Sequence, residues 1–232
     1  MGLFITFEGL DGSGKSTQAR FLYEELKRRR IPVLLTREPG GTRIGEQIRT
    51  TLHAVDNKEM LPTTEILLYS ASRAQLVGEF ILPRLAEGFI VLCDRYVDST
   101  FAYQGYGHGL DLEVLRCISQ FATRGLLPDL TVYLDLDVVT SLNRRRQAHQ
   151  SEAGELNRMD RQRIDFYHRV RQGYLAMIAA DPQRWRVIDA SLPTAAVREA
   201  VYKETLPFIQ NWLSPGGEGN DHETHHEHRE QR

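Results

Sequence analysis

Short apolar runs alternate along the chain with longer segments in which apolar residues recur every three to four positions. The runs are rich in β-branched and aromatic residues and predict buried strands at residues 3–7, 33–35, 89–92, 130–134 and 185–188. The helical spacing predicts helices over residues 16–30, 43–53, 63–86, 111–123, 138–146, 159–180 and 194–212. Because strands that alternate with helices form right-handed crossovers, we expect an α/β fold with a five-stranded, mainly parallel sheet flanked by helices. Ligands of such a sheet bind beyond the carboxyl ends of its strands.

Two polar segments interrupt this pattern. Residues 147–157, QAHQSEAGELN, predict a loop between two helices. From residue 214 onward the chain has almost no apolar residue, so it cannot bury enough surface to offset the entropy of ordering it. We therefore predict one domain over residues 1–213 and a disordered tail over residues 214–232. We assign no metal site to the histidines of this tail, because an unfolded tract supplies no fixed ligand geometry.

The composition limits the classes of partner. With 29 basic and 31 acidic residues the formal net charge is −2, which gives no general attraction to a nucleic-acid polymer or an anionic membrane. The first predicted strand begins at residue 3 and leaves no room for a signal peptide, and no apolar stretch is long enough to span a bilayer. Cys93 lies in an apolar run and Cys117 in a helical pattern, so we expect buried, reduced thiols and a location in the cytoplasm.

A glycine-rich segment follows the first strand and opens the first helix. Residues 9–16, GLDGSGKS, fit the phosphate-binding pattern G-x-x-x-x-G-K-[ST]. Glycine permits backbone conformations closed to other residues, so successive N–H groups can converge on phosphate oxygens at the positive end of a helix. We expect Lys15 to reach the β and γ phosphates of a nucleotide and Ser16 to contact Mg²⁺. A glycine-rich turn that only caps a helix is the alternative. The residues expected to hold the nucleotide are Gly9, Leu10, Asp11, Gly12, Ser13, Gly14, Lys15, Ser16 and Thr17.

A phosphate cradle identifies a nucleotide but not a reaction, since switch proteins, motors and kinases share it. Arginines at the ends of two further strands narrow the choice. Arg37 follows the second strand and Arg95 the third, and two guanidinium groups there could clamp the phosphate of an acceptor molecule. A surface salt bridge is the ordinary alternative for either arginine alone.

Arginines also flank the polar loop. Arg144, Arg145 and Arg146 precede it and Arg158 follows it. The chain has only four lysines, so its many arginines are not a general supply of positive charge. A segment of this kind can close over a transferring phosphoryl group, neutralise its oxygens and exclude water. We therefore predict a lid at about residues 144–158. The alternative is a helix face that only meets solvent.

Five motifs in order make residues 3–212 resemble the thymidylate kinase family: FEGLDGSGKSTQ, TREPGGT, YSASRAQ, DRYVDSTFAYQG and PDLTVYLDLD. The resemblance implies a three-layer P-loop nucleoside monophosphate kinase fold with a short lid. It also implies transfer of the γ-phosphoryl group of ATP to dTMP, a step of dTTP biosynthesis, with Mg²⁺ as cofactor, and a homodimer. The alternatives are another nucleoside monophosphate or deoxynucleoside kinase, or a P-loop switch or ATPase module.

The resemblance further implies roles for the residues around the phosphates. Asp11 would contact the sugar 3′-hydroxyl and help to organise the phosphate and metal region. Arg95 would bridge the acceptor and donor phosphates, and Arg37 would belong to the acceptor phosphate site. Direct in-line transfer would need no strong general base, because a phosphate monoester is already a competent nucleophile.

The resemblance assigns another group of residues to the nucleoside. Tyr69 would stack on thymine, at a position where the family usually has Phe. Arg73 would bind a base carbonyl and so discriminate thymine from cytosine. Tyr103 would pack against the deoxyribose, with Thr100 and Gln104 near the base.

Members of the family differ in where an assisting arginine is placed, in the phosphate loop or on the lid. Here positions 12 and 13 are Gly and Ser, so the sequence resembles the bacterial type with a lid arginine. We expect Arg158 first, and then Arg146, to touch the transferred phosphate. Arg144 is expected to lie against adenine, near residues 189–191.

Overall fold

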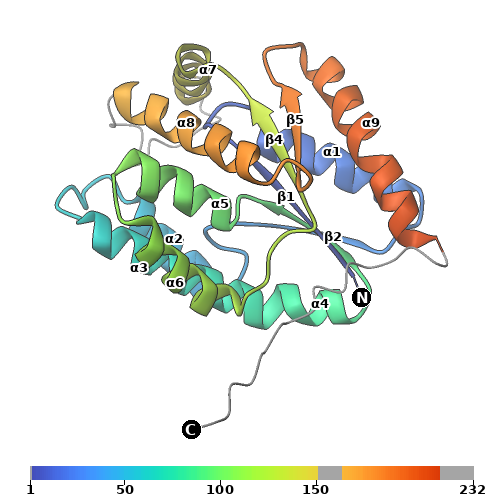
Figure 1. Ribbon diagram of the computed structural model, residues 1–232, viewed down its shortest axis with the longest axis horizontal. Helices are drawn as coiled ribbons and strands as arrows, with labels where there is room; N and C mark the ends of the chain where they lie inside the picture. The colour runs from blue at the N-terminus through green and yellow to red at the C-terminus, as the bar shows by residue number, and fades with distance from the viewer. Residues whose placement is uncertain (1, 151–163, 215–232) are drawn as a thin grey trace, which may run out of the picture.

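The computed structural model describes residues 2–150 and 164–214, and these form one sheet with helices on both sides (Figure 1). The strands of the described chain are β1 (Leu3–Gly9), β2 (Val33–Arg37), β3 (Ile90–Asp94), β4 (Leu130–Asp135) and β5 (Trp185–Asp189). Their order is β2-β3-β1-β4-β5, and every neighbouring pair is parallel. The predicted α/β fold with a five-stranded parallel sheet is confirmed, and the carboxyl ends of the strands lie at the same end of the sheet.

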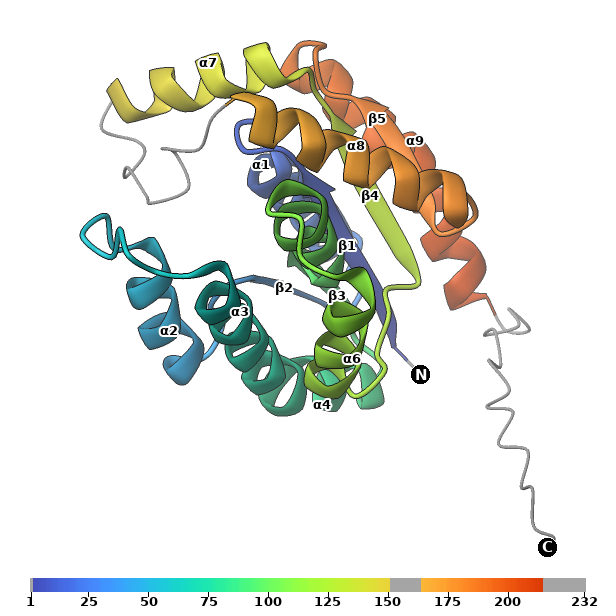
Figure 2. The same cartoon turned by 60° about the vertical axis from the view of Figure 1, so that its left-hand side comes forward.

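Helices cover both faces of this sheet (Figure 2). Helices α1 and α9 pack together on one face, and α3 and α8 lie on the other. The helices are α1 (Lys15–Arg28), α2 (Arg43–His53), α3 (Pro62–Leu76), α4 (Leu82–Ala86), α5 (Val97–Thr100), α6 (Leu112–Thr123), α7 (Val138–Gln150), α8 (Ile164–Ala180) and α9 (Thr194–Leu213), with the π-helical stretches η1 (Val77–Ile81) and η2 (Phe101–Gly107).

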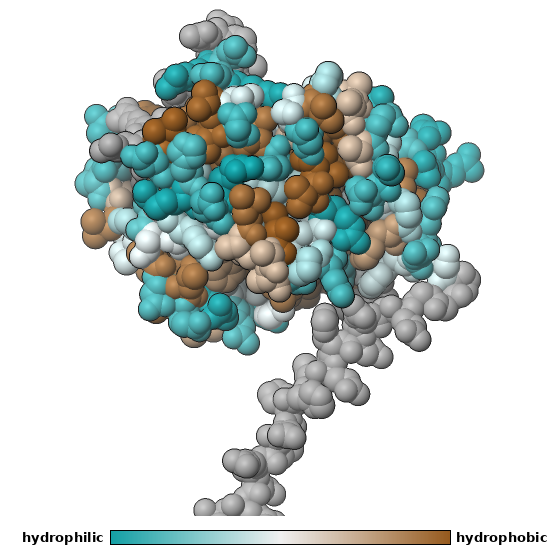
Figure 3. All heavy atoms as spheres, turned by 45° about the horizontal axis from the view of Figure 1, so that its top comes forward, coloured by the Kyte–Doolittle hydropathy of each residue, from teal (hydrophilic) through white to brown (hydrophobic). Residues whose placement is uncertain are grey.

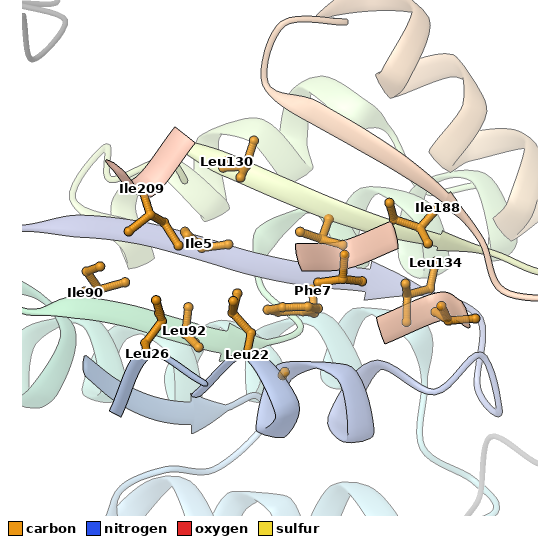
Figure 4. Packing of buried hydrophobic residues seen from close by; sticks show 14 of the residues in the cluster. Ile5, Phe7, Leu22, Leu26, Ile90, Leu92, Leu130, Leu134, Ile188 and Ile209 are labelled. Atoms are coloured by element: carbon orange, nitrogen blue, oxygen red, sulfur yellow. The ribbon is translucent and has the colours of Figure 1, made fainter. Parts of the chain in front are cut away.

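Strand β1 forms the centre of the core because its side chains are buried on both faces of the sheet. Leu3, Ile5 and Phe7 pack into the cluster that α1 and α9 cover (Figure 4). Phe4 points the other way and joins a second cluster with Leu76 of α3. A strand covered on both faces needs apolar residues at successive positions, which explains the unbroken apolar run in the sequence.

Most predicted elements agree with the structure. Each strand ends within two residues of its predicted bounds, and the helix predicted over residues 63–86 is one helical stretch made of α3, η1 and α4. The predicted helix over residues 16–30 ends earlier, at Arg28. Helix α7 continues to Gln150, so the loop prediction for residues 147–150 was wrong. Glutamine and alanine in this stretch are adequate helix formers, which explains the longer helix.

Residues 97–107 are helical, although no helix was predicted there. Helix α5 and the π-helical stretch η2 share this segment. A π-helical turn holds more residues than an α-helical turn, so the apolar residues of the segment miss the usual spacing. In the DRYVDSTFAYQG motif, Asp94 ends β3, and the residues from Val97 onward therefore lie on a helix that periodicity alone could not find.

The two cysteines differ in exposure. Cys93 is buried in β3 as expected, but Cys117 is exposed, so the prediction for Cys117 was wrong. Helix α6 buries Leu115 and Ser119, and a residue midway between them points to the opposite side of the helix.

Some predictions fall outside the described residues. Of the predicted lid, residues 144–150 belong to α7, and residues 151–158 lie outside the described ranges. The predicted tail lies outside them from residue 215 onward.

The face shown in Figure 3 carries hydrophobic patches separated by hydrophilic side chains. Across residues 2–150 and 164–214, no helix is both long enough and apolar enough to cross a bilayer.

Glycines let η2 and α8 approach each other closely. A Cβ atom added at Gly173 of α8 would lie 2.7 Å from the ring of Tyr106 and 2.9 Å from its Cβ. We predict that Gly173→Ala lowers the free energy of unfolding by about 1–3 kcal/mol, because it overpacks this contact. Urea denaturation measures the change.

Gly78→Ala is the matched control, because the nearest atom to its added Cβ is the flexible end of Arg124, 3.2 Å away. We expect it to change the free energy of unfolding by less than about 1 kcal/mol. Equal losses in the two variants would contradict close packing at Gly173.

Candidate active site

A cleft of about 1170 Å³ opens at the carboxyl ends of β1, β2 and β3. The loop after β1 and helix α7 contribute to one side, and α2 and α3 contribute to the other (Figure 2). Clefts for one small molecule usually measure roughly 300–1,000 Å³. This cleft is therefore just above the upper end of that range.

The loop between β1 and α1 has the backbone of a phosphate-binding loop. Gly9, Gly12 and Gly14 have φ values of 144°, 80° and 94°, which a residue with a Cβ rarely adopts. Gly14 is the last residue before α1, and Lys15, Ser16 and Thr17 at the start of that helix line the cleft. The first N–H groups of a helix have no partner within the helix, so this end of α1 suits an anion.

Helix α7 packs against the loop between β1 and α1. The Ser141 hydroxyl donates to the backbone oxygen of Asp11 at 2.6 Å. A Cβ atom at Gly12 would lie 2.8 Å from the backbone oxygen of Ser141. The loop and the first turns of α7 are therefore packed against each other without room for a side chain at position 12.

Lys15 folds back over the loop. Its side chain is buried, and Nζ donates to the backbone oxygen of Leu10 at 2.9 Å. Burial lowers the pKa of Lys15 to about 8; the nearby Arg95 also lowers this pKa, and Asp11 opposes the shift. An anion bound beside this lysine would favour its charged form.

Asp94 is a site residue that sequence reasoning missed. The Ser16 hydroxyl donates to Asp94 Oδ2, and the other carboxylate oxygen, Oδ1, is buried without a hydrogen-bond partner. Its position in the sequence could have identified it, because Asp94 ends the strand beside β1. P-loop proteins have a carboxylate at such a position that helps to hold Mg²⁺.

Arg95 lines the cleft and has a φ of 71°. Its guanidinium donates to Asp11 Oδ1 at 2.6 Å, to Ser99 Oγ at 2.9 Å and to the Tyr103 hydroxyl at 3.1 Å. Burial alone would raise the pKa of Asp11, but Arg95 and Lys15 hold it well below its usual value. Asp11 is therefore a carboxylate, and its contact with Arg95 fixes the direction in which the guanidinium points.

Glu8 supports Arg95 from the core. Its fully buried carboxylate accepts hydrogen bonds from the Tyr96 N–H at 2.8 Å, the Ser99 hydroxyl at 2.6 Å and the Tyr174 hydroxyl at 2.7 Å. Burial raises the pKa of Glu8, although Arg95 opposes the shift from 4.0 Å away. The carboxylate thus joins β1 to the turn that carries Arg95.

Arg73 reaches the cleft from α3 and is also buried. Its Nε donates to Glu38 Oε2 at 2.8 Å, Nη1 to Thr100 Oγ1 at 2.9 Å and Nη2 to the backbone oxygen of Tyr96 at 3.3 Å. Burial raises the pKa of Glu38 to about 7, against the effect of Arg73. These three hydrogen bonds hold the Arg73 guanidinium in one orientation.

Two tyrosines, Tyr69 and Tyr103, also line the cleft. Burial raises the pKa of Tyr69 to about 12, so its hydroxyl is neutral at physiological pH. Tyr103 is buried, and the Arg95 guanidinium lies 5.0 Å from the centre of its ring. The tyrosines thus offer aromatic surface beside polar groups that are already oriented.

Helix α2 supplies further lining residues that the sequence analysis missed. Arg49 donates to the backbone oxygen of Pro39 at 2.9 Å, and burial lowers the pKa of His53 to about 4. Their spacing of four residues places them on one face of α2, but the sequence did not show which face meets the cleft. Arg37 is exposed at the rim and pairs with Glu46 at 2.9 Å.

The arginines of α7 divide into different environments. Arg144 lines the cleft and donates to the backbone oxygen of Ala190 at 2.9 Å, next to the predicted adenine segment. Arg145 also lines the cleft. Arg146 is exposed and lies outside the lining, and Arg158 falls outside the described residues.

The cleft brings together most of the predicted residues. Three loop residues, Gly9, Leu10 and Ser13, are buried behind it instead and support the loop. The predicted residues that line the cleft are Asp11, Gly12, Gly14, Lys15, Ser16, Thr17, Arg37, Tyr69, Arg73, Arg95, Thr100, Tyr103, Gln104 and Arg144.

Comparison with known proteins gives one family. The family model for thymidylate kinase matches residues 7–201. A thymidylate kinase of Roseiflexus sp. (strain RS-1) is 53% identical over 216 residues, covering 90% of this chain and 96% of that protein. A thymidylate kinase of Herpetosiphon aurantiacus is 50% identical over 229 residues, covering 90% and 97%.

A solved structure supports the same assignment. The crystal structure of thymidylate kinase from Ehrlichia chaffeensis matches with a TM-score of 0.69 and 34% sequence identity, covering 87% of this chain and 97% of that one. Sequence similarity and fold similarity thus extend over most of the chain, which belongs to the thymidylate kinase family.

Proposed function

We propose that this protein transfers the γ-phosphoryl group of ATP to dTMP within the cleft, giving dTDP and ADP. The observation that carries the proposal is the shape of the site. The cleft joins the phosphate-binding loop at Lys15 to a second cationic group, Arg37, Arg49 and Arg95, without a barrier between them. A switch or ATPase module needs the first group, whereas a group of three arginines also suits the phosphate of a second, acceptor molecule.

The donor nucleotide is placed at the start of α1. Backbone N–H groups of the loop would bind the phosphates, with the Lys15 ammonium on the β and γ phosphates. Arg144 would lie against adenine, near residues 189–191. The hydrogen bond from Arg144 to Ala190, which fixes this side chain beside the segment, supports that position.

The residues beside Ser16 fit a bound Mg²⁺. The Ser16 hydroxyl and Asp94 are adjacent, and the unpartnered Asp94 Oδ1 is an oxygen with unused acceptor capacity. Mg²⁺ prefers oxygen ligands and usually takes only one or two from the protein when phosphates supply others. Ser16 and Asp94 would hold the ion, with Asp11 close to this region. Its chemistry would be to neutralise the charge on the phosphates.

The acceptor is placed with its phosphate at Arg95 and Arg37 and its base near Arg73. Tyr69 would stack on thymine, and Tyr103 would pack against the deoxyribose. Arg73 is held by Glu38 and Thr100, so its remaining N–H groups would donate to a base carbonyl. Asp11, beside Arg95, would accept from the 3′-hydroxyl.

The reaction needs positioned cations more than a base. Arg95 bridges the two phosphates and stabilises the charge that develops during in-line transfer, and Lys15 does so from the donor side. The acceptor phosphate is itself the nucleophile and needs no proton removed at neutral pH. His53, whose pKa is lowered to about 4, is therefore not needed as a general base. We assign the assisting lid arginine first to Arg158 and then to Arg146.

The oligomer and the compartment complete the proposal. We assign a homodimer, supported by exposed apolar side chains on α3 and α6, Leu67, Val114 and Phe121, of which Phe121 is 88% exposed. The two helices are neighbours in the structure. We place the reaction in the cytoplasm, where ATP is available and thiols such as Cys93 stay reduced.

A coupled assay that detects ADP, run with and without dTMP, tests the function. We expect slow turnover with ATP alone and a large increase on addition of dTMP, because acceptor binding completes the cationic site. Parallel reactions with dUMP, dCMP, dGMP and thymidine give the acceptor preference. Fast turnover without an acceptor would support an ATPase or switch, and a preference for thymidine would support a deoxynucleoside kinase.

Arg95→Ala is expected to lower kcat by about 100-fold to 1000-fold, because a preoriented donor to the developing charge is lost. Steady-state kinetics measure the loss, and the melting temperature shows whether the fold is retained. His53→Gln is the comparison variant, and we expect it to lower kcat less than tenfold. The reverse order of effects would contradict the cationic mechanism.

The affinity for ATP is expected to fall as the pH rises above about 8. Lys15 has a pKa of about 8 in the free protein, and a bound triphosphate favours its charged form. Binding above that pH must therefore take up a proton, and the affinity falls by at most about tenfold per pH unit. Calorimetry at pH 7 and pH 9, in buffers of different ionisation enthalpy, measures both effects.

Lys27→Met, at an exposed position, should leave this proton uptake unchanged. Equal affinity at both pH values, with no proton uptake at pH 9, would show that Lys15 is not the titrating phosphate ligand.

A further inference from the structure

We infer that Glu65 is a positioning residue that sets the orientation of the Gln104 amide and thereby makes the site prefer a base that donates from its ring nitrogen. The inference rests on the proposed function, since it concerns how the acceptor base is selected. Glu65 itself does not line the cleft, so it would act only through Gln104.

The contact between the two side chains is buried. Glu65, in the first turn of α3, is 0% exposed, and Gln104, in η2, is 3% exposed. Gln104 Nε2 donates to Glu65 Oε1 at 2.8 Å. A carboxylate can only accept hydrogen bonds, so the nitrogen of the amide must face Glu65 and the oxygen must face away from it. A neutral partner would not impose this choice.

We infer that the side of the Gln104 amide that faces away from Glu65 meets the cleft. Gln104 lines it together with Arg73 and Thr100, and Arg73 Nη1 donates to Thr100 Oγ1 at 2.9 Å. Thr100 and Gln104 are four residues apart on one helical segment, so they lie on neighbouring turns. The polar edge of the site therefore combines a donor, the Arg73 guanidinium, with an acceptor, the Gln104 amide oxygen.

This order of donor and acceptor matches one class of pyrimidine. Thymine and uracil present a carbonyl oxygen beside an N3–H donor, whereas cytosine presents an amino group beside an N3 acceptor. Arg73 and Gln104 therefore both favour thymine and uracil. If the amide turned over, its nitrogen would face the N3–H of thymine and two donors would oppose each other. Glu65 prevents this by binding the nitrogen on the other side.

Glu65→Gln tests the inference with little change in shape. An amide at position 65 can accept or donate, so it no longer dictates how Gln104 is turned. We expect the ratio of kcat/KM for dTMP to that for dCMP to fall about tenfold, mainly through a higher KM for dTMP. The ratio for dTMP and dUMP should not change, because both bases present the same edge to Gln104.

A double-mutant cycle separates this role from a general effect on packing. In the Gln104→Ala background, Glu65→Gln should cause no further loss of the dTMP:dCMP ratio. His108 Nε2 lies 3.5 Å from the same Glu65 oxygen, so His108→Gln is measured in parallel and should retain the ratio. Glu24→Gln, an exposed carboxylate on α1, is the control for loss of a negative charge.

The outcomes distinguish the two levels of the proposal. If the unmodified protein does not phosphorylate dTMP, the proposed function fails. If it does, but Glu65→Gln keeps its dTMP:dCMP ratio, or lowers the ratio equally without Gln104, the inference about Glu65 is overturned. Should Glu65→Gln fold poorly, Glu65→Asp replaces it. The shorter carboxylate withdraws from Gln104, and an unchanged ratio in that variant would also overturn the inference.

Discussion

The site depends on the buried carboxylate of Glu8, which ties the turn after β3 to the central strand. Its hydrogen bonds to the Tyr96 N–H and the Ser99 hydroxyl hold this turn while Arg95 occupies a left-handed backbone conformation. A residue other than glycine adopts that conformation at a cost, so the surrounding contacts must enforce it. The result is a guanidinium whose direction is fixed by the protein itself.

Burial shapes the part of the cleft around Arg73 in the same way. Arg73 with Glu38, and Gln104 with Glu65, are polar pairs withdrawn from water beside the cleft. Such pairs are expensive to leave incompletely bonded, so each fixes the geometry of its neighbours. The loop before α1 is different, because its polar groups are mainly backbone N–H groups at a helix terminus. The two ends of the cleft thus reach fixed geometry by different means.

The sequence predicted those parts of the site that follow from topology. Parallel strands collect their carboxyl ends, so Arg37 and Arg95 could be expected near Lys15 without knowledge of any distance. It could not predict Arg49 or His53, because the rotation of α2 against the sheet depends on packing. It also missed α5 and η2, where the spacing of a π-helix hides the helical pattern, and it could not distinguish the buried Cys93 from the exposed Cys117. The family resemblance, in contrast, rested on short motifs in order and is confirmed by the comparisons.

The contact of Gly12 with α7 limits how this protein could evolve. Gly12 has a positive φ, and a Cβ atom at this position would collide with the backbone oxygen of Ser141. A substitution at position 12 therefore cannot add a side chain to the loop unless α7 moves away at the same time. Any larger residue at this position therefore requires a change in the packing of α7 on the loop as well as the change of residue itself.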